Sequence, residues 1–263
     1  MHGAAGRMGR AIIGVLDDAP QAELHAAVEY AGAPCQGSDP HVLAGKAARG
    51  LAIGADLPAA LQGASVVIDF SLPTATESVI AACRAARTPL VMGTTGLSPA
   101  QRAALGALAQ ELPVVFAPNY SQGVTALFHL AKRATELLGP EFQAEITEFH
   151  HRHKVDSPSG TAMRLAEVVA EAKGVALGEA GVYGREGQVG ARTPDEIGVF
   201  ALRGGDVVGE HTLYLFGEGE RIEITHRATD RTIFARCAVR AAGWVVQQPP
   251  GLYDMFDVMG VTR

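Results

Sequence analysis

The 263-residue sequence contains few cysteines and no long apolar run. Its three cysteines, Cys35, Cys83 and Cys237, lie far apart and form no CxxC pair. This spacing argues against a disulfide framework and against a cysteine zinc site, and it favours a reducing, cytoplasmic compartment. No apolar run approaches the length of a membrane-spanning helix, and the first residues do not resemble a signal peptide. We therefore expect no membrane association.

An excess of positive charge is also absent. The 22 Lys and Arg residues are outnumbered by 28 Asp and Glu residues, which argues against a nucleic-acid or membrane-surface partner. Aromatic residues make up only 6% of the chain while glycine occurs 31 times, a balance that favours tight α/β packing. The length is sufficient for one large core or two modest ones.

Short apolar runs alternate with alanine-rich stretches in the first half of the chain. Helical periodicity covers Arg7–Leu16, Thr74–Arg87 and Ser98–Glu111, with Thr74 and Ser98 as expected caps. The apolar runs have strand length and lie at Leu24–Val28, Val66–Phe70, Leu90–Met92 and Val114–Ala117. This alternation predicts a parallel, doubly wound sheet covered on both faces.

Strands dominate after about Gly123. A long helix is predicted from there to Leu138, followed by strands at Ile197–Arg203, His211–Phe216 and Arg221–Thr225. A last helix, Thr232–Val246, is expected to return to the first domain. The predicted fold class is α/β, with a Rossmann-like dinucleotide-binding domain over residues 1–121 and 232–263. Residues 122–231 are predicted to form an α+β domain with a mixed sheet.

A glycine-rich loop, Gly3-Ala4-Ala5-Gly6-Arg7-Met8-Gly9, leads into the first predicted helix. Glycines at this spacing let the backbone turn sharply and approach a pyrophosphate at a helix N-terminus. A glycine triplet by itself also arises by chance in helices rich in alanine and glycine. Glu29 lies 20 positions after Gly9, at the end of the next predicted strand, where a carboxylate binds ribose hydroxyls. A solvated loop carboxylate is the alternative interpretation of Glu29.

The start of the chain conflicts with this loop. A dinucleotide-binding glycine loop follows a strand, but only Met1 and His2 precede Gly3. We interpret the chain as lacking several apolar residues at its N-terminus, as a late start codon would produce. We then expect a truncated central strand, which would weaken both the stability of the sheet and cofactor binding.

Two further loops follow predicted strands. Gly93-Thr94-Thr95-Gly96 follows one of them, and Ala117-Pro118-Asn119-Tyr120-Ser121 follows the next. Open α/β sheets bind ligands at the carboxyl ends of their strands, so these loops and the glycine loop are expected to form one rim. Each loop taken singly is also compatible with an ordinary turn.

Side chains that bind anions or move protons are concentrated in residues 148–162. His150, His151, Arg152, His153 and Lys154 occupy five consecutive positions, and the histidines and the lysine can transfer protons at neutral pH. If the segment is a strand end or loop, we expect positions 150, 152 and 154 to share one face and positions 151 and 153 the other. This density predicts a site for a small, multiply anionic ligand.

A helix start follows the basic segment. Ser157 is the expected cap, with Pro158 in the first turn, and Gly160 lets a ligand approach the backbone. The amides of Ser159, Gly160 and Thr161 would then point at a carboxylate of the ligand.

Two other interpretations of the histidines remain. A metal site is disfavoured, and no metal is predicted, because Arg152 and Lys154 would repel a cation and neither a fourth ligand nor HExxH spacing is present. Alternatively, the histidines are ordinary surface residues, although three of the nine histidines fall within four positions.

The segment Glu148–Ala162 resembles the signature of the dihydrodipicolinate reductases of bacterial lysine and diaminopimelate biosynthesis. The glycine loop, Gly93–Gly96 and three later motifs are similar to the same family in the same order, so the resemblance covers nearly the whole chain. The later motifs are Tyr183–Gly187, Gly205–His211 and Gly251–Met255.

The resemblance implies hydride transfer from NADH or NADPH to a cyclic, unsaturated dicarboxylate, giving tetrahydrodipicolinate. It places His150 as the acid/base and Lys154 as the proton donor, with His151, Gly160 and Thr161 as substrate-binding residues. It also implies a homotetramer assembled through the second domain, with hinges near Gln122–Gly123 and Asp230. The implied cofactor contacts are Gly3, Ala4, Ala5, Gly6, Arg7, Met8, Glu29, Gly93, Thr94, Thr95, Ala117, Pro118, Asn119 and Tyr120.

One position departs from the family pattern. Many members have an arginine directly after the acidic residue, where it would meet the 2′-phosphate of NADPH, but this chain has Tyr30 after Glu29. We therefore expect NADH to serve at least as well as NADPH, although Arg7 and Arg10 are alternative partners for the phosphate.

Two alternatives to the reductase remain open. One is another two-domain NAD(P)-dependent dehydrogenase acting on aspartate semialdehyde, homoserine or a sugar. The first of these needs a nucleophilic cysteine in an active-site loop, which the three cysteines do not provide. The other alternative is a dinucleotide-binding protein without turnover. The sequence does not distinguish the hydroxylated from the dehydrated ring as the true substrate.

Overall fold

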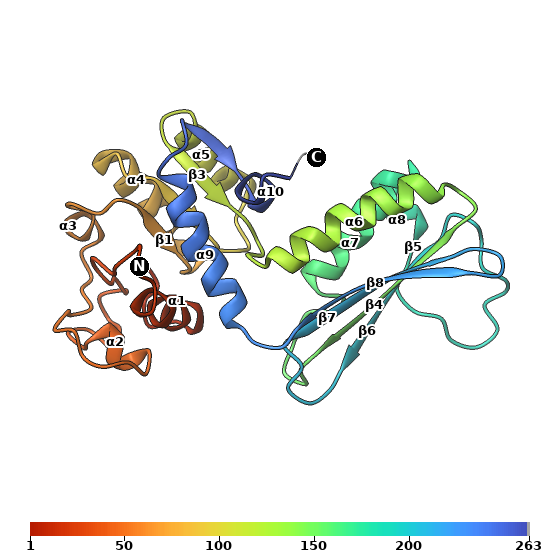
Figure 1. Ribbon diagram of the computed structural model, residues 1–263, viewed down its shortest axis with the longest axis horizontal. Coiled ribbons are helices and arrows are strands. Elements are labelled where there is room, and N and C mark those ends of the chain that lie inside the picture. The colour runs from red at the N-terminus through yellow and green to blue at the C-terminus, as the bar shows by residue number, and fades with distance from the viewer. Residues whose placement is uncertain (262–263) are drawn as a thin grey trace. The chain divides into compact units, whose positions relative to one another are not determined.

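The computed structural model describes residues 1–261 and divides into two compact units (Figure 1). Unit 1 consists of Met1–Gln122 and Thr232–Arg263, and unit 2 of Gly123–Arg231. The chain passes from one unit to the other after Gln122 and returns after Arg231. Each unit has a hydrophobic core of its own.

Unit 1 contains a four-stranded parallel sheet in the order β1-β2-β3-β9. Its first two strands are fully buried, since helices cover both faces of the sheet, and all their residues except Asp69 are apolar. The strands predicted at Val66–Phe70, Leu90–Met92 and Val114–Ala117 are confirmed, whereas the sequence pattern did not indicate β9. The strands are β1 (Val67–Asp69), β2 (Leu90–Met92), β3 (Pro113–Phe116) and β9 (Gly251–Tyr253).

The prediction of a strand at Leu24–Val28 is wrong, because these residues do not form a regular strand. Only Val28 forms bridges, one to His2 and one to Gly54, and His2 also bridges to Asp69. The amide of Val28 donates to the carbonyl of Met1 (2.8 Å), and the amide of His2 donates to the carbonyl of Ile68 (2.9 Å). Residues 1–3 thus lie between Val28 and the end of β1, but they supply only a single bridging residue, so no continuous ladder forms there.

The helices of unit 1 lie close to their predicted positions. Ser98 and Gln101 form the capping box of the helix that begins at Pro99, which confirms the predicted cap. Thr74 is not a cap, because it lies in a 3-10 turn and the following helix has Ala75 at its N-cap without a side-chain hydrogen bond. The elements are α1 (Arg7–Asp17), α2 (Pro40–Leu43), α3 (Leu57–Ala60), η1 (Pro73–Ala75), α4 (Thr76–Ala86), α5 (Pro99–Ala109), α9 (Thr232–Val245) and α10 (Met255–Met259).

The two faces of the unit 1 sheet have separate cores. Val91 and Val115 pack with α1 and α9, whereas Leu90 and Val114 pack with α4 and α5. This is the alternation of side chains along a strand, with both sets buried. The confirmed arrangement is the predicted Rossmann-like one, and it brings the carboxyl ends of β1, β2 and β3 to one edge.

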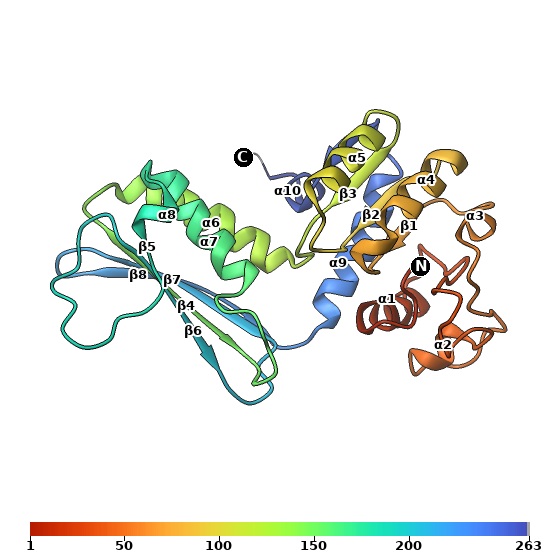
Figure 2. The same cartoon turned by 180° about the vertical axis from the view of Figure 1, so that it is seen from behind.

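Unit 2 contains a five-stranded mixed sheet in the order β5-β6-β4-β7-β8. The central strand β4 is parallel to β6 and antiparallel to β7. Figures 1 and 2 show α6 and α7 on one face of this sheet, where Leu127, Ile146 and Leu165 belong to one buried cluster. The strands are β4 (Gln143–His150), β5 (Gly181–Val182), β6 (Ile197–Arg203), β7 (Gly209–Phe216) and β8 (Arg221–Ala228), and the helices are α6 (Gln122–Leu138), α7 (Gly160–Lys173) and α8 (Leu177–Ala180).

Over residues 1–261, no helix combines the length and the apolar character needed to cross a membrane.

Candidate active site

The glycine loop of unit 1 has no room for side chains at two of its glycines. Gly3 has a φ of 75°, and a Cβ there would lie 2.6 Å from the carbonyl oxygen of Phe70. A Cβ at Gly9 would collide with the carbonyl oxygens of Gly3 and Ala4. Helix α1 begins directly after Gly6, which makes no side-chain cap hydrogen bond. The loop therefore holds its backbone tightly against β1 and presents a helix N-terminus, as a pyrophosphate site requires.

Glu29 lies against this loop. Its Oε2 accepts a hydrogen bond from the amide of Ala5 (3.1 Å), and its Oε1 accepts one from the amide of Tyr30 (3.3 Å). A shallow cavity of about 360 Å³ is lined by Ala5, Gly6, Glu29 and Tyr30, together with residues 33–35. The predicted phosphate loop and the carboxylate predicted to bind the ribose therefore line the same cavity.

A buried carboxylate, Asp69, connects the start of the glycine loop to the Gly93–Gly96 loop. Its Oδ1 is 2.6 Å from Nδ1 of His2, and its Oδ2 accepts a hydrogen bond from Oγ1 of Thr94 (2.6 Å). Thr94 in turn accepts a hydrogen bond from the amide of Ser71 (3.1 Å). Asp69 is fully buried at the end of β1, and the signal for it was a single acid that ends an apolar run. Thr95, the next residue of the loop, is exposed.

The Ala117–Tyr120 loop contributes its backbone to the rim. Tyr120 is buried, and its hydroxyl donates to the carbonyl oxygens of Met92 (3.0 Å) and Val115 (3.2 Å). Burial raises the pKa of Tyr120 well above its usual value, and the nearby charge of Asp69 acts in the same direction. Ala117 is also buried, whereas Pro118 is exposed. The Tyr120 side chain therefore stabilises the loop, and only the exposed part of the loop is available to a ligand.

In unit 2, strand β4 ends at His150, and the basic residues after it form a turn. The amide of His151 donates to the carbonyl of Val207 (2.8 Å), and that of Lys154 donates to the carbonyl of His151 (3.1 Å). The predicted alternation of faces beyond His150 is therefore wrong, because the backbone turns there instead of continuing as a strand.

Glu148 is the centre of a buried hydrogen-bond network in unit 2. Its Oε2 lies 2.5 Å from Nδ1 of His150, and its two oxygens accept a bidentate pair from Arg203 at 2.8 and 2.9 Å. Its Oε1 also accepts a hydrogen bond from the amide of Ser159 (2.9 Å). Burial opposes ionisation of Glu148, but the hydrogen bonds from His150, Arg203 and Ser159 outweigh it and lower its pKa to about 2. Glu148 is therefore a carboxylate at neutral pH.

Because Glu148 is ionised and can only accept hydrogen bonds, it determines which nitrogen of His150 carries the proton. Nδ1 must donate to the carboxylate, so Nε2 is the nitrogen left to exchange a proton with a ligand. A Cβ at Gly209 would lie 3.0 Å from this Nε2, so the glycine on β7 leaves the imidazole its space. His150 itself is 9% exposed, which keeps it largely out of bulk water.

Ser159 rather than Ser157 caps helix α7. Its Oγ accepts a hydrogen bond from the amide of Ala162 (3.1 Å) and lies 3.1 Å from Nε2 of His211. The prediction that Ser157 caps and that the Ser159 amide points at a ligand is wrong, because the Ser159 amide is bonded to Glu148. Gly160 and Thr161 are the first residues of the helix, and Gly160 is exposed.

Positive charge surrounds the turn that follows His150. Burial lowers the pKa of His151, and the charges of Arg231, His150, His153 and Lys154 lower it further. The pKa of His211 is lowered to about 3, mainly by burial and next by His150, so His211 is neutral at physiological pH. A ligand that relieves this repulsion must carry negative charge.

Lys154 is held by a nearby acid. Its Nζ donates to both carboxylate oxygens of Asp156, at 2.8 and 2.9 Å, and its side chain is 20% exposed. The hydrogen bond from Lys154 lowers the pKa of Asp156. Among residues 1–261, no group of three His, Cys, Asp or Glu side chains is arranged to hold a metal ion.

Sequence models of the dihydrodipicolinate reductases match nearly the whole chain. The model of the family's N-terminus matches residues 1–120, and that of its C-terminus matches residues 123–259. The chain belongs to the dihydrodipicolinate reductase family.

Curated relatives and a solved structure agree with this family. The 4-hydroxy-tetrahydrodipicolinate reductase of Halorhodospira halophila is 53% identical over 259 residues, covering 98% of this chain and 97% of the relative. That of Alkalilimnicola ehrlichii is 55% identical with the same coverage. A dipicolinate-bound dihydrodipicolinate reductase from Paenisporosarcina sp. TG-14 has the same fold, with a TM-score of 0.78 at 21% identity, covering 97% of this chain and 96% of that chain. The resemblance found in the sequence is confirmed.

Several residues of these networks were not predicted from the sequence. Glu148 stood inside the recognised segment, but its partner Arg203 lies 55 positions away, and His211 lies 52 positions from Ser159. Only their place in later family motifs or strands could have drawn attention to them. Arg231 and Asp156 carried no signal beyond their charge.

Proposed function

We propose that this protein reduces 4-hydroxy-tetrahydrodipicolinate to tetrahydrodipicolinate, using NADH or NADPH, in diaminopimelate and lysine biosynthesis. Close relatives are named for this substrate, and the solved relative binds dipicolinate. The observation that carries the proposal is the Glu148–His150 pair on the same unit as Lys154 and the N-terminus of α7. A cyclic dicarboxylate requires cationic and helix N-terminal partners, and its reduction requires an acid.

The residues of unit 1 fit a nicotinamide dinucleotide, which supplies the hydride when bound. Gly3 and Gly9 keep side chains away from the loop backbone, so a pyrophosphate can approach the N-terminus of α1. Glu29 would exchange its hydrogen bond from Ala5 for the ribose hydroxyls. The further proposed contacts are Ala4, Ala5, Gly6, Arg7, Met8, Gly93, Thr94, Thr95, Ala117, Pro118, Asn119 and Tyr120.

His150 and Lys154 are the proposed proton-transfer residues. Negative charge that develops on the substrate during reduction needs a nearby acid, and Lys154 supplies that proton. His150 acts as the acid/base through Nε2, since Glu148 holds its Nδ1. Glu148 is in this proposal a positioning residue, because it acts on the substrate only through His150 and through the helix start at Ser159.

His151, Gly160 and Thr161 are the proposed substrate-binding residues. Burial and, after it, the neighbouring positive charges lower the pKa of His151, and a substrate carboxylate that enters among Arg231, His153 and Lys154 would relieve the repulsion. The first amides of α7 offer a second carboxylate position at a helix N-terminus. A substrate carboxylate would also compete with Asp156 for Lys154.

NADH is proposed to serve at least as well as NADPH. Glu29 would repel the 2′-phosphate of NADPH, and Tyr30 cannot neutralise it. Arg10, one alternative partner, donates its Nε to the carbonyl of Ala5 (2.9 Å) and is thereby tied to the loop.

We further propose that residues 1–121 and 232–263 bind the dinucleotide and that residues 122–231 bind substrate and form a homotetramer. Exposed apolar side chains on strands of unit 2 support the assembly, since Phe149, Leu202 and Ile222 are each at least 40% exposed. Three free cysteines support a location in the reducing cytoplasm.

A thiol-dependent dehydrogenase is the weaker candidate. Cys83 and Cys237 are buried, and burial raises their pKa values, that of Cys83 to about 12, so neither is a ready nucleophile. A dinucleotide-binding protein without turnover remains a second candidate, and an activity assay separates it from the reductase.

The test is NAD(P)H oxidation followed by absorbance, with substrate generated in situ by dihydrodipicolinate synthase from pyruvate and aspartate semialdehyde. We expect turnover with both cofactors and a loss of about 10²- to 10⁴-fold in kcat for Lys154→Ala. Lys46→Ala, which removes a lysine of unit 1 that pairs with Asp18, is the matched control and should stay near wild-type activity. No turnover by a protein that still binds NADH would reject the reductase and favour the binding protein.

A further inference from the structure

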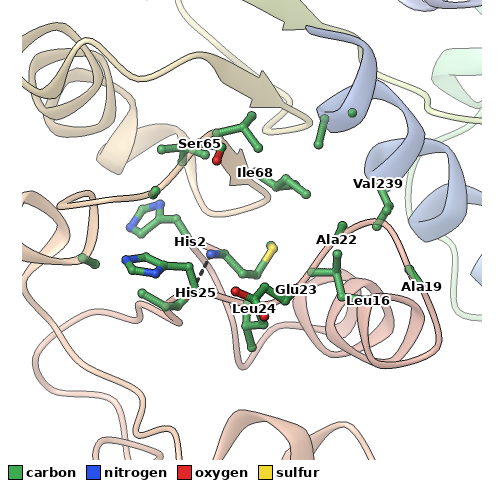
Figure 3. A pocket seen from close by; sticks show the side chains of 18 of the residues that line it. His2, Leu16, Ala19, Ala22, Glu23, Leu24, His25, Ser65, Ile68 and Val239 are labelled. Carbon is green, nitrogen blue, oxygen red and sulfur yellow. Dashed lines mark hydrogen bonds between the residues drawn. The ribbon is translucent and has the colours of Figure 1, made fainter. Parts of the chain in front are cut away.

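Unit 1 contains a cavity of about 860 Å³ that is not lined by any of the proposed cofactor or substrate contacts (Figure 3). Apolar side chains such as Leu24 and Ile68 surround it. Two of the charged side chains that line it, Asp17 and Arg49, pair with each other at 2.7 Å, so these charges neutralise one another. In unit 2, by contrast, Arg203 is the common partner of two separate parts of the candidate site.

Arg203 is the last residue of β6, and its guanidinium makes four hydrogen bonds. Nη1 donates to Oε2 of Glu148 (2.8 Å) and to the carbonyl of Leu202 (2.7 Å). Nη2 donates to Oε1 of Glu148 (2.9 Å) and to the carbonyl of Asp156 (2.8 Å). Each terminal nitrogen carries two hydrogens, so all four hydrogens have an acceptor and the orientation of the guanidinium is fixed.

Two of these partners each hold one of the proposed proton-transfer residues. Oε2 of Glu148 lies 2.5 Å from Nδ1 of His150. The carboxylate of Asp156 accepts two hydrogen bonds from Nζ of Lys154, at 2.8 and 2.9 Å. Arg203 therefore joins the carboxylate that orients His150 to the turn that holds Lys154.

We infer that Arg203 is a positioning residue of the proposed reduction, because its guanidinium fixes the turn of Lys154 relative to the carboxylate that orients His150. The inference rests on the proposed function, in which these two residues transfer protons to one substrate. Proton transfer requires donor and acceptor within hydrogen-bond reach, and a displacement of about 1 Å can slow a reaction about 100-fold. Arg203 acts through Glu148 and Asp156 and not on the substrate.

Arginine suits this link in a way that lysine does not. A planar guanidinium binds both oxygens of a carboxylate and still has a hydrogen for a third acceptor, whereas an ammonium is a compact point charge. Arg203→Lys therefore keeps a positive charge beside Glu148 but loses the fixed geometry that also reaches the Asp156 carbonyl. Keeping the charge matters, since the side chain of Glu148 is 0% exposed and a buried carboxylate without a partner is strongly destabilising.

The experiment compares Arg203→Lys with Arg185→Lys. Arg185 forms the same kind of bidentate pair, at 3.0 and 2.9 Å, with Glu145 on the opposite face of β4. We expect Arg203→Lys to lower kcat about tenfold and to increase the solvent deuterium isotope effect on kcat, with the KM for NADH unchanged. Arg185→Lys should stay near wild type. Equal kcat values and equal isotope effects in the two variants would overturn the inference.

A double variant separates the two branches of the link and leaves neither charge of the pair uncompensated, so it also serves if Arg203→Lys does not fold. Glu148→Gln alone affects only the branch to His150. Glu148→Gln combined with Arg203→Gln should have a kcat about fivefold lower still, because the turn of Lys154 is released as well. A kcat equal to that of Glu148→Gln alone would mean that Arg203 acts only through Glu148, which contradicts the link to Lys154.

Amide exchange tests the same link without turnover. The amide of Ser159 donates to Glu148 (2.9 Å), and the amide of Lys154 donates to the carbonyl of His151 (3.1 Å). Both amides should exchange faster in Arg203→Lys than in Arg185→Lys, because the guanidinium holds both segments. Absence of turnover in the wild type would reject the proposed reductase, whereas unchanged exchange at both amides would overturn the link whether or not the wild type is active.

Discussion

Two regions of the molecule are built in opposite ways. One is the rim of unit 1, formed by the glycine loop and the loops Gly93–Gly96 and Ala117–Tyr120, and the other is the region of unit 2 around His150 and Lys154. The rim depends on missing side chains, since a Cβ at Gly3 or Gly9 would collide with backbone. The histidine–lysine region depends on side chains that position one another, with Glu148 held by three partners. A binding surface made of backbone is destroyed by adding atoms, whereas a proton-transfer site is destroyed by removing a single hydrogen bond.

After the loss expected for Lys154→Ala, the largest effect is expected where the hydrogen-bond network around Glu148 is broken. Glu148→Gln should lower kcat by about 10- to 100-fold and leave the KM for NADH nearly unchanged, because His150 loses the carboxylate that orients it. Steady-state kinetics with both substrates varied measure this. Glu167→Gln, which alters an exposed carboxylate of α7, is the control. A proportional rise in the KM for NADH would contradict the positioning role.

From the lowered pKa of Glu148 we also expect the protein to lose folding stability in acid. The folded-state pKa of Glu148 is depressed from 4.5 to about 2, so its ionisation stabilises the fold above pH 4.5 and the contribution is lost as pH falls toward 2. The contribution at neutral pH is about 3 kcal/mol in the free energy of unfolding. Urea unfolding between pH 7 and pH 3 should show this loss in the wild type and a flatter profile in Glu148→Gln.

On the backbone side, Gly9→Ala should weaken NADH binding about tenfold or more, because the new Cβ meets the carbonyl oxygens of Gly3 and Ala4. Fluorescence titration with NADH gives the Kd. Gly14→Ala in the same helix is the control, since a Cβ there meets nothing closer than 3.9 Å and should stabilise the helix slightly. Equal affinities of the two variants would show that the loop tolerates added atoms.

The smallest effect is expected at the edge of the rim. Tyr30→Arg should raise the kcat/KM of NADPH relative to NADH by about five- to tenfold, because an exposed guanidinium can pair with the 2′-phosphate. Parallel assays with both cofactors measure the ratio, and Tyr30→Phe should leave it unchanged. A wild-type enzyme that already prefers NADPH strongly would contradict the argument from Glu29 and Tyr30.

Local patterns were predictable because their partners are close in sequence. The strand at Leu90–Met92 and the Ser98–Gln101 capping box follow from apolar runs and short-range caps. The cap of α7 was misassigned to Ser157, because the choice between two serines depends on Glu148 binding the Ser159 amide. The strand at Leu24–Val28 failed because a strand exists only with a partner ladder, and residues 1–3 supply one bridge.

The family, the alternation of strands and helices in the Rossmann-like unit, and the residue types available for proton transfer all follow from the sequence. Which of those residues form hydrogen bonds with one another depends on the tertiary structure. Arg203 reaches Glu148 because β6 pairs with β4, and His211 reaches Ser159 because β7 pairs with β4 on its other side. Such contacts join residues more than 50 positions apart. No local periodicity encodes them, since they arise only when strands pair across the sheet.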